Sequence, residues 1–218
     1  MADPRNEHVQ RQRAFVATKG ALPAARCSLS QLKQVYATEV DVQLRGIALK
    51  AFQRQVVSWM LDNERHGFDL SKLVTLRDSK DAMSNMKGGV IAMEMGMGKT
   101  ACAIAACKQN RMPTLVVAPA LTCVQWCHQF SEYAPELSNA MVYCTSQKRN
   151  QESLMLTDVV VLNSTSNLID CVAKRVQRVI VDESHEVCKG SSGEAIRFLH
   201  NLSCYPNVQV VWLVSGTP

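Results

Sequence analysis

From residue 89 onwards the chain repeats one pattern, in which a short run of aliphatic, often β-branched residues precedes a segment of helix length. The runs are almost continuously apolar and lie at 89–93, 114–118, 140–143, 158–162, 178–181 and 208–214. Strands that are apolar on both sides need helices on both faces of the sheet, which is typical of parallel sheets. Right-handed β-α-β connections place such strands in one sheet. The sequence therefore predicts an α/β fold with a doubly wound, mainly parallel sheet.

Helices are expected between these runs and also before the first of them. The expected helices lie at about 28–40, 49–60, 99–108, 120–133 and 193–202, with a flexible lead-in over 1–27 and a loop over 63–87. Within 49–60 the apolar residues recur at helical spacing, and Gln53 projects into their face. A buried amide without a partner costs about 1–3 kcal/mol. We therefore expect Gln53 either to lie at the edge of this face or to have a specific hydrogen-bond partner.

The composition restricts the class of protein. Apolar residues make up 47% of the 218 residues and charged residues 20%, which permits a packed core and excludes wholesale disorder. No apolar run approaches the roughly 18–20 residues of a membrane span, and the first residues contain no hydrophobic signal segment. The nine cysteines include no Cys-x-x-Cys pair, so we expect a reducing compartment and no zinc site. The default is an intracellular protein with no membrane partner.

The formal charge of +5 is unevenly distributed along the chain. Residues 1–80 carry 13 Lys and Arg against 8 Asp and Glu, a difference of +5, whereas residues 81–218 carry 11 against 11. A basic front part indicates an anionic partner such as nucleic acid, and an ordinary solvated surface explains the same charge equally well.

A glycine-rich segment between the first expected strand and a helix has the setting of a phosphate-binding loop. Its candidate nucleotide-binding residues are consecutive: Met95, Gly96, Met97, Gly98, Lys99 and Thr100. The two glycines let the backbone approach phosphates, and the helix that follows points free N–H groups at them. We expect Lys99 to neutralise the β- and γ-phosphate oxygens and the Thr100 hydroxyl to ligate Mg²⁺. For the loop alone, a glycine-rich turn with an incidental Lys-Thr pair is the alternative.

Two further polar segments follow expected strands. Asp182 and Glu183 come directly after 178–181, and adjacent carboxylates favour a nearby cation because they repel each other. We expect Asp182 to hold Mg²⁺, Glu183 to orient or deprotonate the attacking water, and His185 to sense the γ-phosphate. A solvated acidic turn is the alternative.

The third segment, Ser-Gly-Thr-Pro at 215–218, by itself predicts only a turn. In a parallel sheet all three segments leave the carboxyl ends of strands, where such folds bind ligands. We therefore expect them to meet along one rim and to enclose one magnesium nucleotide.

Together these motifs resemble those of the superfamily-two helicase-like ATPases, specifically the first RecA-like lobe of the Swi/Snf-type DNA translocases. The matching segments are 49–60, where a glutamine reads adenine, 88–100 (motif I), 117–126 (motif Ia), 179–185 (motif II) and 213–218 (motif III). The resemblance covers roughly residues 44–218 and implies a RecA-like ATP-binding domain there, preceded by a flexible basic extension over 1–43. It also implies a partner for Gln53, the adenine base.

The resemblance implies ATP and Mg²⁺ as cofactors, with Lys99, Asp182 and Glu183 as catalytic residues. It implies double-stranded DNA, including DNA in chromatin, as the partner, and hence a nuclear protein. The turn at 119–120 is the better candidate for contact with the DNA backbone, because N–H groups open the helix after it. Trp126, in motif Ia, is interpreted as a packing residue and not as a base-stacking residue.

In the resembled family ATP binds between two lobes, and arginines of the second lobe complete the site. An arginine finger contributes about 10³–10⁵ to the rate of phosphoryl transfer. No second lobe follows motif III in this sequence, so we expect the chain alone to bind Mg-ATP, to hydrolyse it very slowly and not to translocate. A non-catalytic nucleotide-binding regulatory module is one alternative. The other is a DEAH-type RNA helicase lobe, against which the Gln53 segment and the Gln125-Trp126 pair argue.

Overall fold

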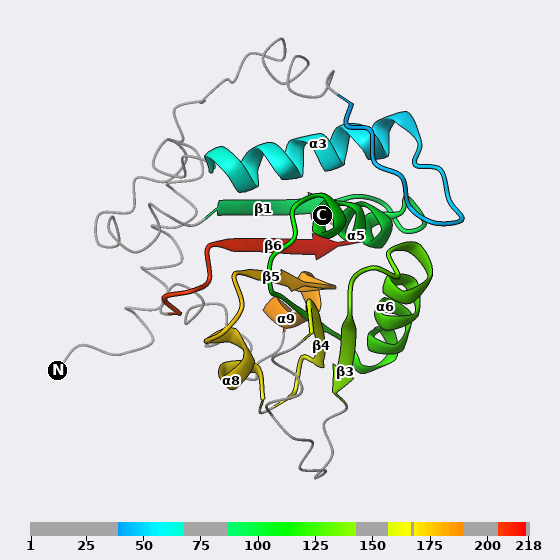
Figure 1. Cartoon of the computed structure of the whole chain (residues 1–218). Helices are drawn as coiled ribbons and strands as arrows, with labels where there is room; N and C mark the ends of the chain where they lie inside the picture. Colours follow the sequence, from blue (N-terminus) through cyan, green and yellow to red (C-terminus); the bar gives the residue numbers. More distant parts are fainter. Residues whose placement is uncertain (1–38, 68–86, 143–156, 167, 190–204, 217–218) are drawn as a thin grey trace, which may run out of the picture. The chain divides into compact units, whose positions relative to one another are not determined.

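The computed structural model describes residues 39–67, 87–142, 157–166, 168–189 and 205–216, which all belong to the compact unit Val35–Pro218. A six-stranded sheet forms the centre in the order β1-β6-β5-β2-β4-β3, and all neighbouring strands are parallel (Figure 1). The strands are β1 (Lys87–Ala92), β2 (Thr114–Ala118), β3 (Asn139–Val142), β4 (Val159–Asn163), β5 (Arg178–Val181) and β6 (Val210–Ser215). The described helices are α3 (Ala51–His66), α5 (Lys99–Gln109), α6 (Ala120–Tyr133), α8 (Ile169–Ala173) and α9 (Ser184–Lys189).

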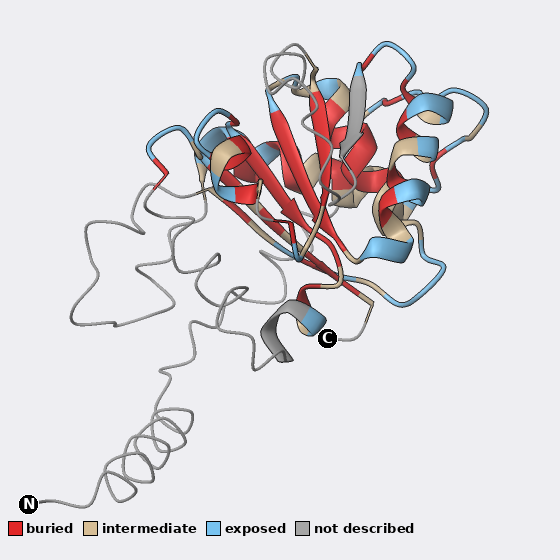
Figure 2. Cartoon of the chain, turned by 90° about the horizontal axis from the view of Figure 1, so that it is seen from below, coloured by how far each residue is buried: buried red, intermediate tan, exposed pale blue. Residues whose placement is uncertain are grey.

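The sheet is covered on both faces, because successive side chains of a strand point to opposite sides. On β2, Val116 and Ala118 join the core that α3, α5 and α6 cover, whereas Leu115 and Val117 join the core beside α8. Every residue of β2 and of β5 is buried. Figure 2 shows that most of the central sheet is buried. The prediction of a doubly wound, parallel sheet with helices on both faces is confirmed.

The predicted strands agree with the observed ones to within two residues at each end. Helix α6 covers its predicted range, and α5 extends past its range by a single residue. The short helices α8 and α9 were not predicted. The lead-in at 1–27, the helix at 193–202 and most of the helix at 28–40 lie outside the described residues, and residues 39–40 are not helical. None of the described helices is both long and apolar enough to cross a membrane.

The prediction was wrong at the carboxyl end of α3. A helix was expected over 49–60 and a loop from residue 63, but the helix begins at Ala51 and ends at His66. The cause lies in tertiary structure, because Glu64 is buried and its carboxylate pairs with Arg178 of β5. A polar contact between distant segments keeps the last turn helical, and the apolar periodicity carries no sign of it.

The Glu64–Arg178 pair attaches α3 to the amino end of β5. Arg178 donates from Nε to Oε1 at 2.7 Å and from Nη2 to Oε2 at 2.6 Å, and the two side chains are 0% and 1% exposed for Glu64 and Arg178. Trp212 and Asn110 donate to the same carboxylate at 2.9 Å and 2.7 Å. Buried charges are tolerated only when their hydrogen-bonding groups are satisfied in this way. The network therefore fixes the position of α3 on the sheet.

Candidate nucleotide site

The glycine loop, residues 95–100, connects β1 to α5 and bends sharply at its two glycines. Gly96 and Gly98 have φ angles of +80° and +83°, a left-handed conformation that favours glycine. Gly98 is also the N-terminal cap of α5. A methyl group at Gly98 would lie 2.3 Å from Gln53 Nε2, whereas a methyl group at Gly96 would meet nothing within 4 Å. The loop therefore opens a helix whose first N–H groups are free for an anion.

Gln53 connects α3 to the glycine loop. Its Oε1 accepts a hydrogen bond from the backbone N–H of Lys50 at 2.8 Å, and its Nε2 donates to the Met97 carbonyl at 3.0 Å. The amide therefore has specific protein partners, which is one of the two arrangements expected for a polar group on this face of the helix. One N–H of Nε2 remains after the bond to Met97.

Lys99 folds back beneath the loop and reaches the segment that follows β6. Its Nζ donates to the carbonyls of Met93 at 3.0 Å and Glu94 at 3.1 Å. A methyl group at Gly216 would lie only 3.4 Å from Nζ. The backbone N–H of Met93 donates to the Ser215 carbonyl at 3.4 Å. The first and the third predicted segments therefore lie against each other, whereas Thr217 and Pro218 lie outside the described residues.

Asp182 follows β5 and is 7% exposed. Its Oδ2 accepts a hydrogen bond from the Trp126 indole at 2.7 Å, and its Oδ1 accepts one from the Glu183 N–H at 3.0 Å. Burial raises the pKa of the Asp182 carboxyl above its ordinary value, while the Trp126 hydrogen bond and the positive charge of Lys99 oppose the rise. A carboxylate desolvated in this way is stabilised by a neighbouring cation.

Glu183, His185 and Ser215 join the second segment to the third. Glu183 has a φ of +46° and is the only described non-glycine residue with a positive φ, a conformation that costs about 1–2 kcal/mol. His185 Nδ1 lies 3.2 Å from Glu183 Oε2 and 3.0 Å from Ser215 Oγ. Strained backbone of this kind is characteristic of functional sites.

The side chains at this edge fit a magnesium ion. Carboxylate and hydroxyl oxygens are the ligands that Mg²⁺ prefers, and Asp182 and Thr100 supply these two groups. Thr100 is half-buried in the first turn of α5, and the buried Asp182 carboxylate has a cationic neighbour in Lys99. The two predicted magnesium ligands, Thr100 and Asp182, therefore offer oxygen atoms of a suitable kind.

Sequence reasoning missed the hydrogen bond of Trp126. The predicted packing role is confirmed, because Trp126 is 1% exposed and its ring lies 6.0 Å from that of Phe130. The indole N–H also reaches a candidate magnesium ligand 56 positions along the chain. The sequence did contain a signal for this contact. Trp126 lies on the helix that follows β2, and β2 pairs with β5, the strand that ends directly before Asp182.

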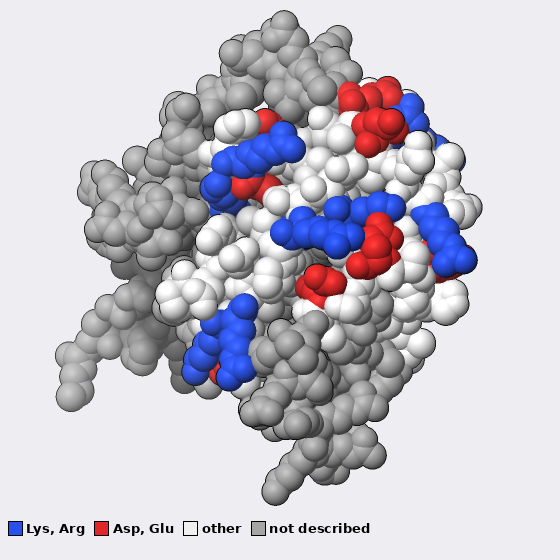
Figure 3. Space-filling model, in the orientation of Figure 1, with Lys and Arg blue, Asp and Glu red and all other residues white. Residues whose placement is uncertain are grey.

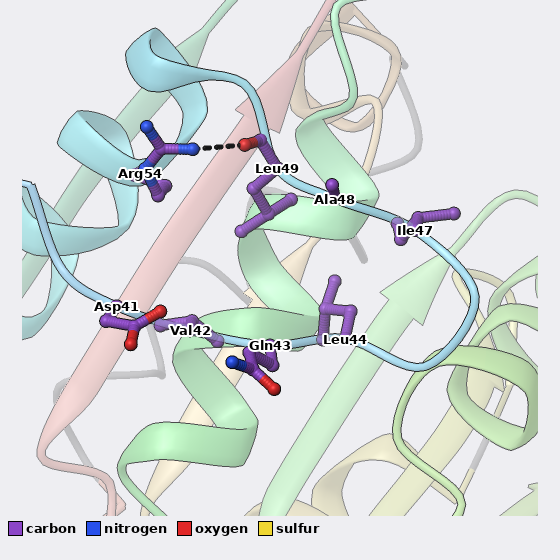
Figure 4. Close-up of a pocket in the computed structure, with 8 residues that line it drawn as sticks. All are labelled: Asp41, Val42, Gln43, Leu44, Ile47, Ala48, Leu49 and Arg54. Carbon is purple, nitrogen blue, oxygen red and sulfur yellow. Dashed lines mark hydrogen bonds between the residues drawn. The ribbon is translucent and has the colours of Figure 1, made fainter.

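A hollow of about 400 Å³ lies beside the chain segment that precedes α3 (Figure 4). Its lining residues are Asp41, Val42, Gln43, Leu44, Ile47, Ala48, Leu49 and Arg54. Arg54 Nη1 donates to the Leu49 carbonyl at 2.6 Å. No residue of the glycine loop or of the 182–185 segment lines this hollow, so it is distinct from the candidate nucleotide site.

The described charges do not form a single basic surface in the view of Figure 1, because Lys and Arg lie beside Asp and Glu there (Figure 3). The ion pairs Arg54–Glu39, at 2.6 Å, and Lys108–Glu136, at 2.8 Å, are examples of this mixing. Most of the basic front part predicted over 1–80 lies outside the described residues.

A parallel sheet with a strand–glycine loop–helix unit and an acidic pair at one edge defines an α/β fold of the RecA-like class. Residues 52–218 match the family model of the SNF2-related domain, and the chain therefore belongs to that family. Among solved structures, the SWI2/SNF2 ATPase core of Sulfolobus solfataricus in complex with dsDNA is similar, with a TM-score of 0.60 and 22% identity. The alignment covers 83% of this chain and 34% of that one, and supports the RecA-like fold.

Two curated relatives are several times longer than this chain. A Xenopus laevis SWI/SNF-related matrix-associated actin-dependent regulator of chromatin, subfamily A-like protein 1, is 26% identical over 193 residues, covering 88% of this chain and 17% of the relative. An uncharacterized ATP-dependent helicase of Mycoplasma pneumoniae is 24% identical over 186 residues, covering 75% of this chain and 18% of the relative. The chain thus spans about a sixth of these relatives and is an SNF2-type, helicase-like N-terminal ATPase lobe.

Proposed function

We propose that residues 44–218 form the Mg-ATP-binding lobe of a DNA-dependent ATPase that moves on duplex DNA, with residues 1–43 as an N-terminal extension. The convergence of three loops carries the proposal. Lys99 Nζ lies 3.4 Å from the position of a methyl group on Gly216, and His185 Nδ1 lies 3.0 Å from Ser215 Oγ. A glycine loop, an acidic pair and a third polar loop at one sheet edge supply what binding of a magnesium nucleotide requires.

Each side chain of the rim has a part in hydrolysis. Lys99 neutralises the β- and γ-phosphate oxygens, while Thr100 and Asp182 hold Mg²⁺, which when bound offsets the charge that develops on the phosphates. Glu183 orients the attacking water and takes its proton as the bond to the γ-phosphorus forms and the ADP oxygen leaves. His185, beside Glu183, relays the presence of the γ-phosphate to the loop after β6.

Gln53 is proposed to read the adenine base. Its Oε1 and one Nε2 proton are engaged by Lys50 and Met97, which fixes the plane of the amide. The remaining Nε2 proton is available to an adenine nitrogen.

The DNA partner is supported by the edge where β2 and β4 end. The turn at 119–120 and the segment 163–165 lie side by side there, because the Ser164 N–H donates to the Ala118 carbonyl at 2.9 Å. The N–H groups that open α6 suit a phosphate of the duplex backbone. The Sulfolobus core is bound to dsDNA, and the Xenopus relative is a regulator of chromatin. We therefore propose a nuclear protein that acts on duplex DNA, with a second RecA-like lobe in the full protein.

Replacement of Lys99 by alanine tests the nucleotide site. We expect Lys99→Ala to lose at least about tenfold in ATP affinity, equivalent to about 1.4 kcal/mol, because a direct phosphate contact is removed. Lys108→Ala, in the last turn of the same helix, should leave affinity unchanged. Isothermal titration with Mg-ATP measures both variants, and circular dichroism checks that they remain folded. Equal affinity of the Lys99 variant and the wild type would show that the glycine loop does not bind phosphate.

The DNA proposal predicts salt-sensitive binding to duplexes. Neutralised phosphates release counterions, so the logarithm of the affinity should fall steeply and linearly with the logarithm of salt concentration. Fluorescence anisotropy with a labelled duplex and the corresponding single strand measures this dependence. An affinity that does not change with salt concentration, or binding only to the single strand, would contradict the proposal of a duplex translocase.

A further inference from the structure

The Trp126 indole donates its N–H to Asp182 across the boundary between α6 and the end of β5. The distance from Nε1 to Oδ2 is 2.7 Å, and the two residues are 1% and 7% exposed. Packing alone does not require a tryptophan, because a phenylalanine ring would occupy the layer beside Phe130 without offering a donor. A hydrogen bond to an ionised acceptor is roughly twice as strong as one between neutral groups. The N–H therefore has a specific effect on the carboxylate.

The two oxygens of Asp182 are held by donors from different parts of the chain. Oδ2 is held by Trp126 and Oδ1 by the backbone N–H of Glu183, at 3.0 Å. One donor on each oxygen fixes the plane of the carboxylate. Each oxygen has a second lone-pair site, so the group can still coordinate a cation. Of the two donors, only the indole can be removed by changing a side chain.

Helix α6, which carries Trp126, is attached firmly to the sheet because it continues directly from β2. The backbone N–H of Asp182 donates to the Val117 carbonyl of β2 at 2.8 Å, and β2 pairs with β5 in register. Phe130 and Cys123 hold α6 in the core with 0% and 2% exposure. The backbone and the carboxylate of Asp182 are thus both positioned by the β2–α6 unit.

We propose that Trp126 is a positioning residue for magnesium, whose indole N–H holds the Asp182 carboxylate in the orientation that binds the ion of the nucleotide. This inference rests on the proposed function, because it concerns the same site. Groups that orient a metal ligand typically change metal affinity by about 10–100-fold when they are removed. Trp126 reaches the ion only through Asp182, so its loss affects the magnesium dependence of binding and not the affinity for nucleotide without magnesium.

The test is a magnesium titration of the 218-residue chain with a fluorescent ATP analogue. For Trp126→Phe, which retains an aromatic ring and removes the donor, we expect the magnesium concentration at half-saturation to rise by about tenfold or more. The dissociation constant measured in EDTA should stay within about twofold of the wild-type value, since no phosphate contact is changed. If Trp126→Phe does not fold, benzothienylalanine at position 126 keeps the ring size and replaces the N–H by sulfur.

Two variants separate the hydrogen bond from packing. Trp212→Phe removes an indole N–H from another buried carboxylate, Glu64, which it contacts at 2.9 Å near the other end of β5. Phe130→Leu loosens the aromatic layer around Trp126 and removes no hydrogen bond. Trp212→Phe should leave the magnesium midpoint unchanged, and Phe130→Leu should shift it by less than Trp126→Phe does, because the indole donor remains.

Three outcomes would count against the inference or its basis. A Trp126→Phe midpoint equal to the wild type overturns the positioning role, and so does an equal shift in either control. A wild-type chain that binds no nucleotide at any magnesium concentration instead overturns the proposed function.

Discussion

Gly98 and Gln53 constrain each other, although they are 45 positions apart. Gly98 has no side chain, and this leaves the space in which the Gln53 amide reaches the Met97 carbonyl. In return, the amide holds the glycine loop against the start of α3. The glycine is required here for two independent reasons: its left-handed φ and the close approach of a neighbour.

Alanine at the two glycines of the loop should separate these reasons. Gly96→Ala places an alanine in a left-handed conformation without any steric contact, and it should lower the free energy of unfolding by about 1–2 kcal/mol. Gly98→Ala also places a methyl group 2.3 Å from Gln53 Nε2 and displaces that amide from Met97, so we expect a further loss of about 0.5–1.5 kcal/mol, the net value of one hydrogen bond. Urea denaturation followed by circular dichroism measures both.

The double variant Gly98→Ala/Gln53→Ala tests the cause, because it removes the amide that the methyl group meets. Its destabilisation should be smaller than the sum of the two single effects. Additive effects would mean that Gln53 does not lie against the loop.

Helix α3 is held at both of its ends, and each end serves a different purpose. At its start, Gln53 contacts the glycine loop, and at its end Glu64 pairs with Arg178 of the sheet. The buried charge pair sets the position of the helix, and the position of the helix places the amide at the rim. A substitution in the Glu64–Arg178 pair, which lies far from the rim, should therefore mainly lower the free energy of unfolding.

Arg178→Met should lower the free energy of unfolding by about 3–5 kcal/mol, because it leaves the Glu64 carboxylate buried without a countercharge. Adding Glu64→Gln should recover part of this loss, since the amide removes the charge and its oxygen still accepts from Trp212. Lys108→Met breaks a half-exposed pair and should cost no more than about 1 kcal/mol. Chemical denaturation measures these three variants and Glu64→Gln alone, which completes the double-mutant cycle. Additivity of the Arg178 and Glu64 substitutions would contradict a coupled pair.

The lobe as a whole carries the proposed nucleotide-binding residues, and its alignments cover only 17% and 18% of the two relatives. A phosphoryl-transfer site without an arginine finger loses about 10³–10⁵ in rate. We expect the 218-residue chain to bind Mg-ATP and to show turnover near background, with or without duplex DNA.

A phosphate-release assay on this chain and on a longer reading frame that contains a second lobe tests this expectation. The longer protein should hydrolyse ATP faster by the factor expected for an arginine finger. Equal rates would show that the second lobe adds nothing to catalysis. A longer protein that binds ATP and stays at background even with DNA would instead favour a non-catalytic nucleotide-binding module.

The order of the elements was predictable because it depends on local pattern. Continuous apolar runs such as 114–118 and 178–181 are buried on both faces, and the glycines at 96 and 98 mark a turn between a strand and a helix. The glycine loop and the acidic pair could be placed at one edge from sequence, because parallel strands end on the same side of a sheet. The matching of these motifs also led to the family, which the comparison over 52–218 shows.

The sequence by itself determined the six strands, the helices α5 and α6, the edge that carries the polar loops and the family to which the chain belongs. Only the tertiary structure decided that α3 runs to His66, that Gln53 bonds to Met97, and that the Trp126 indole faces Asp182. The reason is physical. The apolar pattern and the glycine positions are local properties of the sequence, whereas hydrogen bonds and ion pairs between residues 44 to 114 positions apart exist only after the sheet has brought those segments together.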